Sequence, residues 1–398
     1  MKITKEYLQK ALTELNFKAY TEIQKAVIPE ALKKRDIIAS SPTGTGKTHS
    51  YLIPLFEHLD EHLEEIQTVV LSPTRELAKQ IYDMAQVIAK NSPDPIDIRL
   101  YVGGKDRDKE LERLTKKQPQ IVIGTPGKIY DLAIKTNALK VYKAKKLIID
   151  EADMALEIGF LDAIDAIART MNAQLHMMVF SATISESLKP FLRKYLRQPV
   201  EINYEDRPLK TLNITHQLFR TSDDEAKLKK LRQIIQTIQP YLAMIFVNKK
   251  DDVERIVQHI YQDNKAVVAL HGDLPPRKRK QVLRDIKNLN YQYIVATDIA
   301  SRGIDIEGVS HIINYDLPKD MTFFIHRIGR TGRMGASGES ITFYNDKDTH
   351  AFAFFDKHNI ELKLKDPRPK KSVKPMKKSG KSDKVKTTKK TNRRRRSQ

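Results

Sequence analysis

Residues 36–50 read "DIIASSPTGTGKTHS" and indicate the fold class. An apolar run that is typical of a buried strand leads into a turn with two glycines, and a helix-like pattern follows. Gly44 and Gly46 allow the backbone N–H groups to curl around an anion, with the N-terminus of a helix behind them. Lys47 can then reach the outer phosphates of a nucleotide, and Thr48 can hold Mg²⁺. A glycine-rich turn without a ligand is the alternative that the pattern leaves open.

Similar apolar runs recur along the chain, each followed by a polar turn and an amphipathic stretch. Such runs suit strands that are buried on both faces of a parallel sheet. Their alternation with helical patterns predicts an α/β protein with two doubly wound parallel-sheet domains. The runs of the first domain are RDIIAS, TVVLSP, IRLYVGG, QIVIGTP, KLIIDEAD and MMVFSAT, and those of the second are MIFVN, AVVALHG, YIVATD, HIINYD and ESITFYN.

The two series meet in a polar, aperiodic segment around residues 203–213. We therefore place a first domain at residues 1–205, an interdomain linker at 206–212 and a second domain at 213–366. Residues 367–398 form a basic tail with 15 Lys or Arg residues and one Asp. The tail cannot bury enough apolar surface to offset the entropy of ordering, so we expect it to be disordered. It is either an arm that binds polyanions or a solubilising extension.

The composition excludes several classes of protein. The 398 residues include no cysteine, which excludes disulfides and thiolate-bound metal centres. No apolar run approaches the roughly 18 residues that span a bilayer, and the start of the chain does not resemble a secretory signal. These features predict a cytoplasmic protein. Much of the formal net charge of +21 lies in the tail.

A second informative stretch is "LIIDEADMAL", residues 147–156, where an apolar run ends in three carboxylates. If a nucleotide arrives with Mg²⁺, the metal needs a carboxylate at a strand end. Asp150 is the candidate metal partner, acting through water because Mg²⁺ keeps much of its hydration shell. Glu151 is the candidate that orients or deprotonates the attacking water. A solvated acidic turn is the simpler alternative for this cluster.

The letters D-E-A-D at 150–153 resemble the motif that names the DEAD-box RNA helicases, and other motifs of that family lie around it in order. They are FKAYTEIQ, SPTGTGKT, PTRELA, Gly103–Gly104, TPGK, SAT, ATDIASRGID and HRIGRTGR, within about residues 5–345. The resemblance implies two tandem RecA-like domains and the use of ATP and Mg²⁺. The compact core with a short basic tail looks like the bacterial members, including the cold-shock group.

The resemblance also implies which residues bind and hydrolyse ATP. The implied nucleotide-binding residues are Tyr7, Phe17, Thr21, Gln24, Thr43, Gly44, Thr45, Gly46, Lys47, Thr48 and Asp305, with Thr48 and Asp150 on the metal. The implied catalytic residues are Lys47, Asp150, Glu151, Arg330 and Arg333. The last two act as arginine fingers from the second domain. The amide of Gln24 complements the donor and acceptor edge of adenine. Tyr7 either stacks on the base or belongs to the core.

A further set implied by the resemblance binds RNA or couples the domains. The RNA-binding residues are Arg75, Gly104, Thr125, Lys128, Arg279 and Thr297, and the coupling residues are Asp153, Ser181, Thr183, His326 and Arg327. Contacts of this kind go to the RNA backbone and carry little sequence information. Lys128 stands where the family more often has Arg, and Pro276 stands where it usually has Gln, which puts the RNA contact at that loop in question.

The sequence thus predicts an ATP-dependent RNA helicase that hydrolyses ATP on RNA binding. It would unwind short RNA duplexes locally or remodel RNA–protein complexes. We expect a monomer with RNA as its partner, and ribosome-assembly or RNA-decay factors as possible protein partners. Two alternatives stay open: a DNA-directed ATPase of the same superfamily, and a non-catalytic RNA-binding scaffold or chaperone.

Overall fold

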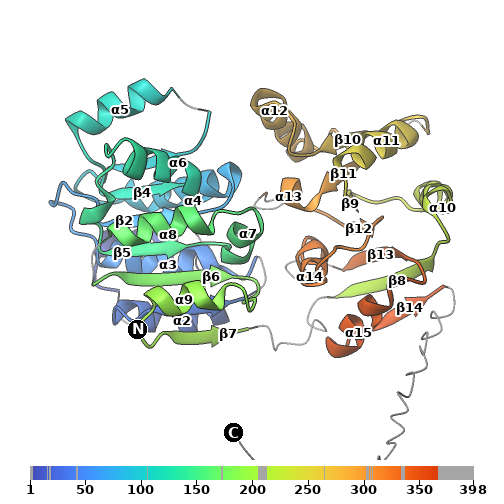
Figure 1. Ribbon diagram of the computed structural model, residues 1–398, viewed down its shortest axis with the longest axis horizontal. Coiled ribbons are helices and arrows are strands. Elements are labelled where there is room, and N and C mark those ends of the chain that lie inside the picture. Colours follow the sequence, from blue (N-terminus) through green and yellow to red (C-terminus); the bar gives the residue numbers. More distant parts are fainter. Residues whose placement is uncertain are drawn as a thin grey trace, which may run out of the picture.

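The protein is described by a computed structural model that places two parallel β-sheets side by side, each covered by helices (Figure 1). The residues described are 3–15, 17, 19–41, 44–104, 106–171, 174–204, 213–263, 265–301, 304, 306, 308–332 and 337–365, without the side chains of residues 276 and 299. The linker predicted at 206–212 and the tail predicted at 367–398 lie outside the described residues. No helix within the described part of the chain is long and apolar enough to cross a membrane.

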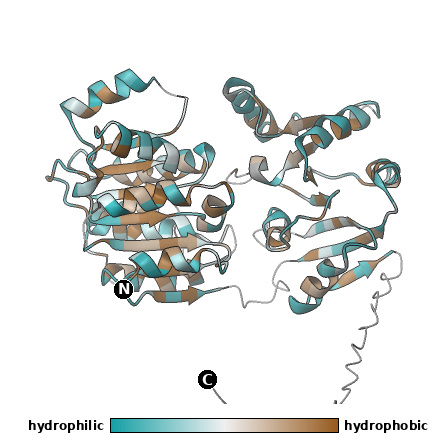
Figure 2. Ribbon diagram, viewed as in Figure 1, coloured by the Kyte–Doolittle hydropathy of each residue, from teal (hydrophilic) through white to brown (hydrophobic). Residues whose placement is uncertain are grey.

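The first sheet contains seven parallel strands in the order β3-β4-β2-β5-β6-β1-β7. Almost every residue in its central strands is buried, which explains why they read as continuous apolar runs instead of alternating ones. The strands are β1 Ile37–Ser40, β2 Thr68–Leu71, β3 Ile98–Tyr101, β4 Ile121–Gly124, β5 Lys146–Ile149, β6 His176–Ser181 and β7 Val200–Asn203. Figure 2 shows these strands as a mainly hydrophobic layer between helices with hydrophilic outer faces.

Helices cover both faces of the first sheet and form two separate apolar layers. One layer contains α1 Glu6–Glu14, α2 Glu22–Leu32, α3 Lys47–Glu57 and α4 Arg75–Ala89. The other contains α5 Arg107–Lys116, α6 Pro126–Tyr130, α7 Ala152–Glu157, α8 Leu161–Thr170 and α9 Lys189–Tyr195, with short helical turns at Asp131–Lys135 and Val141–Lys143.

The second sheet repeats this architecture with seven parallel strands in the order β10-β11-β9-β12-β13-β8-β14. Its strands are β8 Ile214–Arg220, β9 Ala243–Val247, β10 Val267–Leu270, β11 Tyr293–Thr297, β12 His311–Asn314, β13 Gly338–Tyr344 and β14 Leu362–Leu364. Its helices are α10 Asp224–Thr237, α11 Lys250–Tyr261, α12 Pro276–Lys287, α13 Asp298–Ser301, α14 Thr322–Ile328 and α15 Thr349–Lys357. The predicted α/β class with two doubly wound parallel sheets is therefore confirmed.

The motifs gather where the carboxyl ends of the first sheet's strands face the second domain. β1 runs into the glycine-rich loop, β5 into the acidic turn and β6 into Ser181. In doubly wound sheets this edge is the usual ligand-binding edge, because loops from several strands converge there. The fold thus brings segments that are far apart in the sequence to one place, beside the second domain (Figure 1).

Candidate nucleotide and RNA site

The side chain of Lys47 turns back to the start of the glycine-rich loop. Gly46 caps α3 with φ +96°, a conformation that is costly for a residue with a Cβ. Lys47 is buried, and its Nζ donates a hydrogen bond to the carbonyl oxygen of Ser41 at 2.7 Å. The same Nζ lies 3.3 Å from Oε1 of Glu151. The loop therefore holds a positive charge where the outer phosphates of a nucleotide would lie.

Gln24 connects the start of α2 to this loop. Its Oε1 accepts from the backbone N–H of Thr21 at 2.9 Å, and its Nε2 donates to the carbonyl of Gly46 at 3.2 Å. A Cβ on Gly46 would lie 2.6 Å from Nε2, so glycine is also required for this close approach. One hydrogen and one lone pair of the amide remain for adenine. The role of Gln24 in recognising adenine stays a prediction.

The two aromatic residues predicted near the base lie in different places. Phe17 contacts the ring of His49 edge-on, at a centroid distance of 4.9 Å, directly after the loop. Tyr7 is buried in the core, and its hydroxyl donates to Glu61 at 2.9 Å. The hydroxyl also approaches the carbonyl of Phe56, near the end of α3 that is remote from the loop. This position favours the core role for Tyr7 and not the stacking role.

Asp150 and Glu151 follow β5 directly and lie beside the loop. Asp150 is 2% exposed, and the hydroxyl of Tyr51 donates to its Oδ2 at 2.8 Å. Thr48 lies close to the same hydroxyl. Burial and the neighbouring charge of Glu151 raise the pKa of Asp150 above its ordinary value, although Lys47 opposes this. A nearby divalent cation would stabilise the ionised form of this buried carboxylate.

Glu151 adopts the left-handed region, with φ +50°, which is uncommon for a residue with a side chain. Its backbone N–H donates to Oδ1 of Asp150 at 3.0 Å. A strained backbone conformation of this kind persists only where the surrounding structure enforces it, and such residues cluster at functional sites. The Glu151 carboxylate lies beside Lys47, 3.3 Å from its Nζ.

Asp153 joins the acidic turn to the end of β6. Its Oδ2 accepts from the backbone N–H of Thr183 at 3.1 Å and from the Thr183 hydroxyl at 3.2 Å. Its own N–H donates to Oγ of Ser181 at 3.0 Å. The structure therefore assembles three of the predicted coupling residues into one hydrogen-bonded unit.

His326 brings the second domain to this unit. Its Nε2 lies 3.5 Å from Oδ2 of Asp153, and both side chains are buried. The two side chains are in contact across the domain boundary, but the separation is too long for a good hydrogen bond. Burial alone would raise the pKa of Asp153, but His326 and Lys47 outweigh it and hold the pKa well below its ordinary value. The contact makes the acidic turn sensitive to the position of the second domain.

Replacing His326 with Ala is expected to lower RNA-stimulated ATP turnover about 10–100-fold, because the variant loses a buried contact between the domains. ATP binding should change little, since the loop lies in the first domain. Steady-state turnover with and without RNA, together with interdomain energy transfer, measures both properties. His350→Ala, at an exposed position on α15, is the matched control. Wild-type turnover and closure in His326→Ala would remove this contact from the coupling.

Two of the predicted arginines, Arg327 on α14 and Arg330 just after it, bind groups of the second domain. Arg327 is 1% exposed and donates to both carboxylate oxygens of Asp298, at 2.6 and 2.7 Å. Arg330 is also buried, and its Nη1 donates to the carbonyl of Ile304 at 2.7 Å. The other residues predicted around the phosphates and ribose, Thr43, Asp305 and Arg333, lie outside the described residues.

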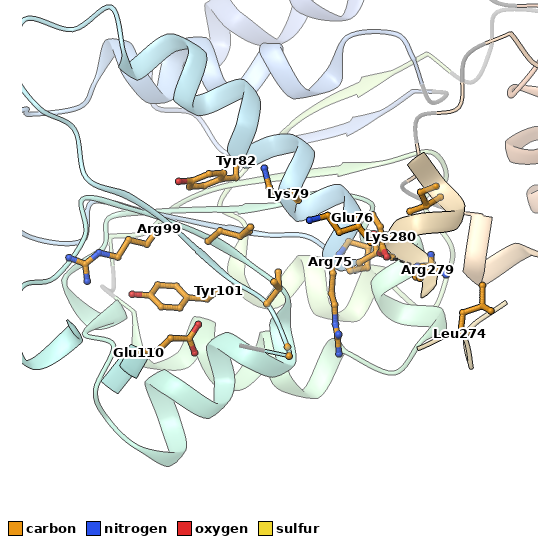
Figure 3. A pocket seen from close by; sticks show the side chains of 18 of the residues that line it. Arg75, Glu76, Lys79, Tyr82, Arg99, Tyr101, Glu110, Leu274, Arg279 and Lys280 are labelled. Carbon is orange, nitrogen blue, oxygen red and sulfur yellow. Dashed lines mark hydrogen bonds and ion pairs between the residues drawn. The ribbon is translucent and has the colours of Figure 1, made fainter. Parts of the chain in front are cut away.

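A pocket of about 1170 Å³ opens between the domains and contains three of the six predicted RNA-binding residues. Arg75 lines it from the first domain, and Arg279 lines it from the second (Figure 3). Gly104 belongs to the lining from the first domain as well. A Cβ on Gly103 would lie 2.8 Å from Nη2 of Arg75, so the glycine pair makes room for that side chain. Arg279 reaches across to Glu76 and forms an ion pair between the domains.

The remaining three predicted RNA-binding residues lie elsewhere. Thr297 lines a second interdomain pocket of about 480 Å³, together with Asp153 and Thr183. Thr125 is buried at the start of α6, and its N–H donates to the carbonyl of Tyr101. Lys128 lies 2.6 Å from Glu110, a residue that lines the larger pocket. Pro276 occupies the first position of α12, where proline is favourable because no hydrogen-bond donor is needed.

Sequence reasoning missed three residues of the site. Tyr51 binds the Asp150 carboxylate, Glu76 pairs with Arg279, and Glu110 pairs with Lys128. Tyr51 lies one helical turn beyond Lys47, so its position on the same face was readable from the spacing. Glu76 follows Arg75 within PTRELA and was also visible. Nothing local indicated Glu110, because its partner lies on a different helix.

Comparisons with known proteins agree with this geometry. Residues 21–191 match the family model described as DEAD/DEAH box helicase, and residues 226–335 match that of the helicase conserved C-terminal domain. The DEAD-box ATP-dependent RNA helicase CshB of Listeria monocytogenes is 43% identical over 363 residues, which cover 91% of this chain and 83% of that protein. CshB of Bacillus subtilis is 45% identical over 359 residues, covering 90% and 81%.

The two-domain arrangement also matches a solved structure. Dbp5 of S. cerevisiae, bound to RNA and ADP BeF3, superimposes with a TM-score of 0.80 and 26% sequence identity. The match covers 90% of this chain and 93% of that one. The expected RecA-like fold of both domains and the resemblance to bacterial family members are thereby confirmed.

Proposed function

The chain belongs to the DEAD-box family of ATP-dependent RNA helicases, and we propose that its ATP is hydrolysed between the glycine-rich loop and the acidic turn. The observation that carries this is the meeting of Lys47 and Glu151 at 3.3 Å, beside the buried Asp150. Lys47 would bind the outer phosphates. Glu151 would orient the attacking water and take its proton. Gln24, Phe17 and the loop residues would hold the rest of the nucleotide.

Mg²⁺ fits the residues present. Asp150 is a buried carboxylate with a raised pKa, and Thr48 lies near the hydroxyl that binds it. Among the described residues no three potential metal ligands from His, Cys, Asp and Glu form a cluster. That agrees with a metal that takes one or two protein ligands and completes its shell with water and phosphate oxygens. Bound there, Mg²⁺ would neutralise charge on the phosphates.

Closure of the two domains would couple this chemistry to RNA. His326 already reaches Asp153, and Asp153 binds Thr183. Arg330 lies in the turn that follows the helix of His326, and it would stabilise the charge that develops during hydrolysis, together with Arg333. The protein would act as a monomer, unwinding short duplexes locally or remodelling RNA–protein complexes. Ribosome-assembly or RNA-decay factors and a cytoplasmic location remain part of the proposal.

RNA would bind along the pocket lined by Arg75, Gly104 and Arg279, mainly through its backbone. The 2′-hydroxyl would then distinguish RNA from DNA. Arg279 forms an ion pair with Glu76, and Lys128 forms one with Glu110. RNA phosphates would therefore have to displace these two carboxylates.

Phosphate release with and without single-stranded RNA, followed by unwinding of matched RNA and DNA duplexes, tests the function. We expect RNA to stimulate turnover at least about 10-fold, and a short RNA duplex to separate only when ATP is present. Equal unwinding of a DNA duplex would favour the DNA-directed alternative. Binding without any ATP turnover would favour the RNA chaperone.

A further inference from the structure

A basic cavity of about 850 Å³ lies at the amino-terminal edge of the first sheet, opposite the edge that carries the nucleotide loop. Its lining comes from the residues that precede five adjacent strands, β2, β5, β6, β1 and β7. Because these strands are parallel and neighbouring, the segments that lead into them meet at one place. The size is in the range of pockets that hold small molecules.

The floor of this cavity contains a buried lysine beside a buried histidine. Lys146 begins β5 and is 9% exposed, and His176 begins β6 and is 8% exposed. The two residues are direct register partners in the parallel pair, so their side chains emerge on the same face of the sheet. Lys146 has neither an ion-pair nor a hydrogen-bond partner among the described residues. Lysine is rarely buried to this extent unless it is paired.

The surroundings of Lys146 add positive charge instead of neutralising it. Six basic side chains line the cavity against three carboxylates, Asp36, Asp60 and Glu65. Asp36 already accepts backbone hydrogen bonds from Met177 and Arg197, and Glu65 pairs with Lys143. The six basic residues are Lys34, Arg35, Lys143, Lys145, Lys146 and Arg197.

Two histidines supply further unused polar atoms. Nε2 of His176 lies 2.8 Å from the carbonyl of Arg35, and Nε2 of His58 lies 3.1 Å from the carbonyl of Leu32. A carbonyl accepts, so both rings carry their proton on Nε2. Nδ1 of each ring is buried and makes no hydrogen bond within the described chain.

We propose that this cavity is a binding site for a small phosphorylated anion, with a phosphate group seated on Lys146. The ammonium groups of the lysines at the rim would bind further phosphate oxygens, because each is a compact positive charge with three hydrogen-bond donors. Three glutamine amides and the apolar side chains of Leu63, Ile66 and Leu175 line the rest of the cavity and suit an organic portion of such a ligand. The site is separate from the nucleotide loop, which lies at the other edge of the sheet.

The electrostatics of the empty cluster agree with this assignment. Burial, followed by the charges of Lys34 and Lys5, lowers the pKa of Lys146 to about 8. Burial, followed by Lys146 and Lys34, lowers the pKa of His58 to about 4. A bound anion would offset the repulsion between these like charges and would favour the protonated form of both groups.

The test measures anion binding with the nucleotide loop disabled. Full-length Lys47→Ala protein is titrated by calorimetry with inorganic tripolyphosphate in magnesium-free buffer. We expect a tight binding phase that is weakened at least about 10-fold when Lys146→Met is added, because a charged partner is lost. Adding Lys116→Met instead removes an exposed lysine on α5 and should leave the affinity unchanged. Equal affinities of the Lys146→Met and Lys116→Met proteins would overturn the proposal.

Hydrogen exchange locates the site and separates the anion from RNA. Tripolyphosphate should slow exchange in residues 143–146 and 174–176, while a single-stranded oligoribonucleotide should not. Protection of these two segments by RNA alone would assign the cavity to RNA binding instead. Lys146→Met in the otherwise native chain should keep RNA-stimulated ATP turnover, which verifies that the variant folds and that the site is independent of the proposed ATPase.

Discussion

Replacing Glu151 with Gln is expected to lower ATP turnover about 10²–10⁴-fold while ATP and RNA still bind. The amide keeps the shape of the side chain but cannot accept the proton of the attacking water. Lys47, which lies 3.3 Å from the carboxylate, would keep its hydrogen bond to Ser41 and remain available to the phosphates. Loss of the negative charge beside Asp150 should, if anything, favour binding of an anionic nucleotide.

Single-turnover phosphate release, together with separate titrations of nucleotide and RNA, distinguishes this outcome from a folding defect. Glu112→Gln is the matched control, because Glu112 is exposed on α5 and pairs with Lys116 within the same helix. Its turnover should equal that of the wild type. If Glu151→Gln retained turnover within about threefold of the wild type, Glu151 would not be the general base, and a different group would have to activate the water.

The alternation of apolar runs and helical patterns was enough to predict two doubly wound parallel sheets. Buried parallel strands are mainly apolar on both faces, so each strand is visible in the sequence as a short continuous apolar run. The same locality explains why the loop at Lys47 and the turn at Asp150 were recognisable. Each is a short contiguous segment whose residue types have a specific chemistry.

Contacts between distant segments were not readable in the same way. Lys128 and Glu110 read as independent surface charges, and the pair forms only because α5 and α6 lie on one face of the sheet. Tyr7 fits both the core and the base-stacking role by spacing, and its bond to Glu61 depends on the packing of α1. The cluster around Lys146 is assembled from five segments, so the sequence shows it only as scattered basic residues.

Arg327 shows how a motif residue can have a structural role that its motif does not reveal. The sequence assigned it to coupling between the domains, yet every partner that its guanidinium contacts in the described chain belongs to the second domain. Besides Asp298, it donates to the carbonyl of Asp316 at 2.5 Å and to Oδ1 of Asn314 at 3.2 Å. It also lies over the ring of Phe246, 5.0 Å from the centroid. It thus ties α13 and α14 to the strands β9 and β12.

Replacing Arg327 with Met is therefore expected to destabilise the second domain by about 3–5 kcal/mol, because Asp298 loses its bidentate partner in a largely buried place. Arg255→Met is the matched control. It breaks a half-exposed pair with Asp252 on α11 and should cost less than about 1 kcal/mol. Hydrogen exchange in increasing urea, followed in second-domain peptides, is the suitable measurement because the two domains need not unfold together. A loss below about 1 kcal/mol with RNA-stimulated turnover abolished would instead place Arg327 in the coupling of the domains, as the sequence suggested.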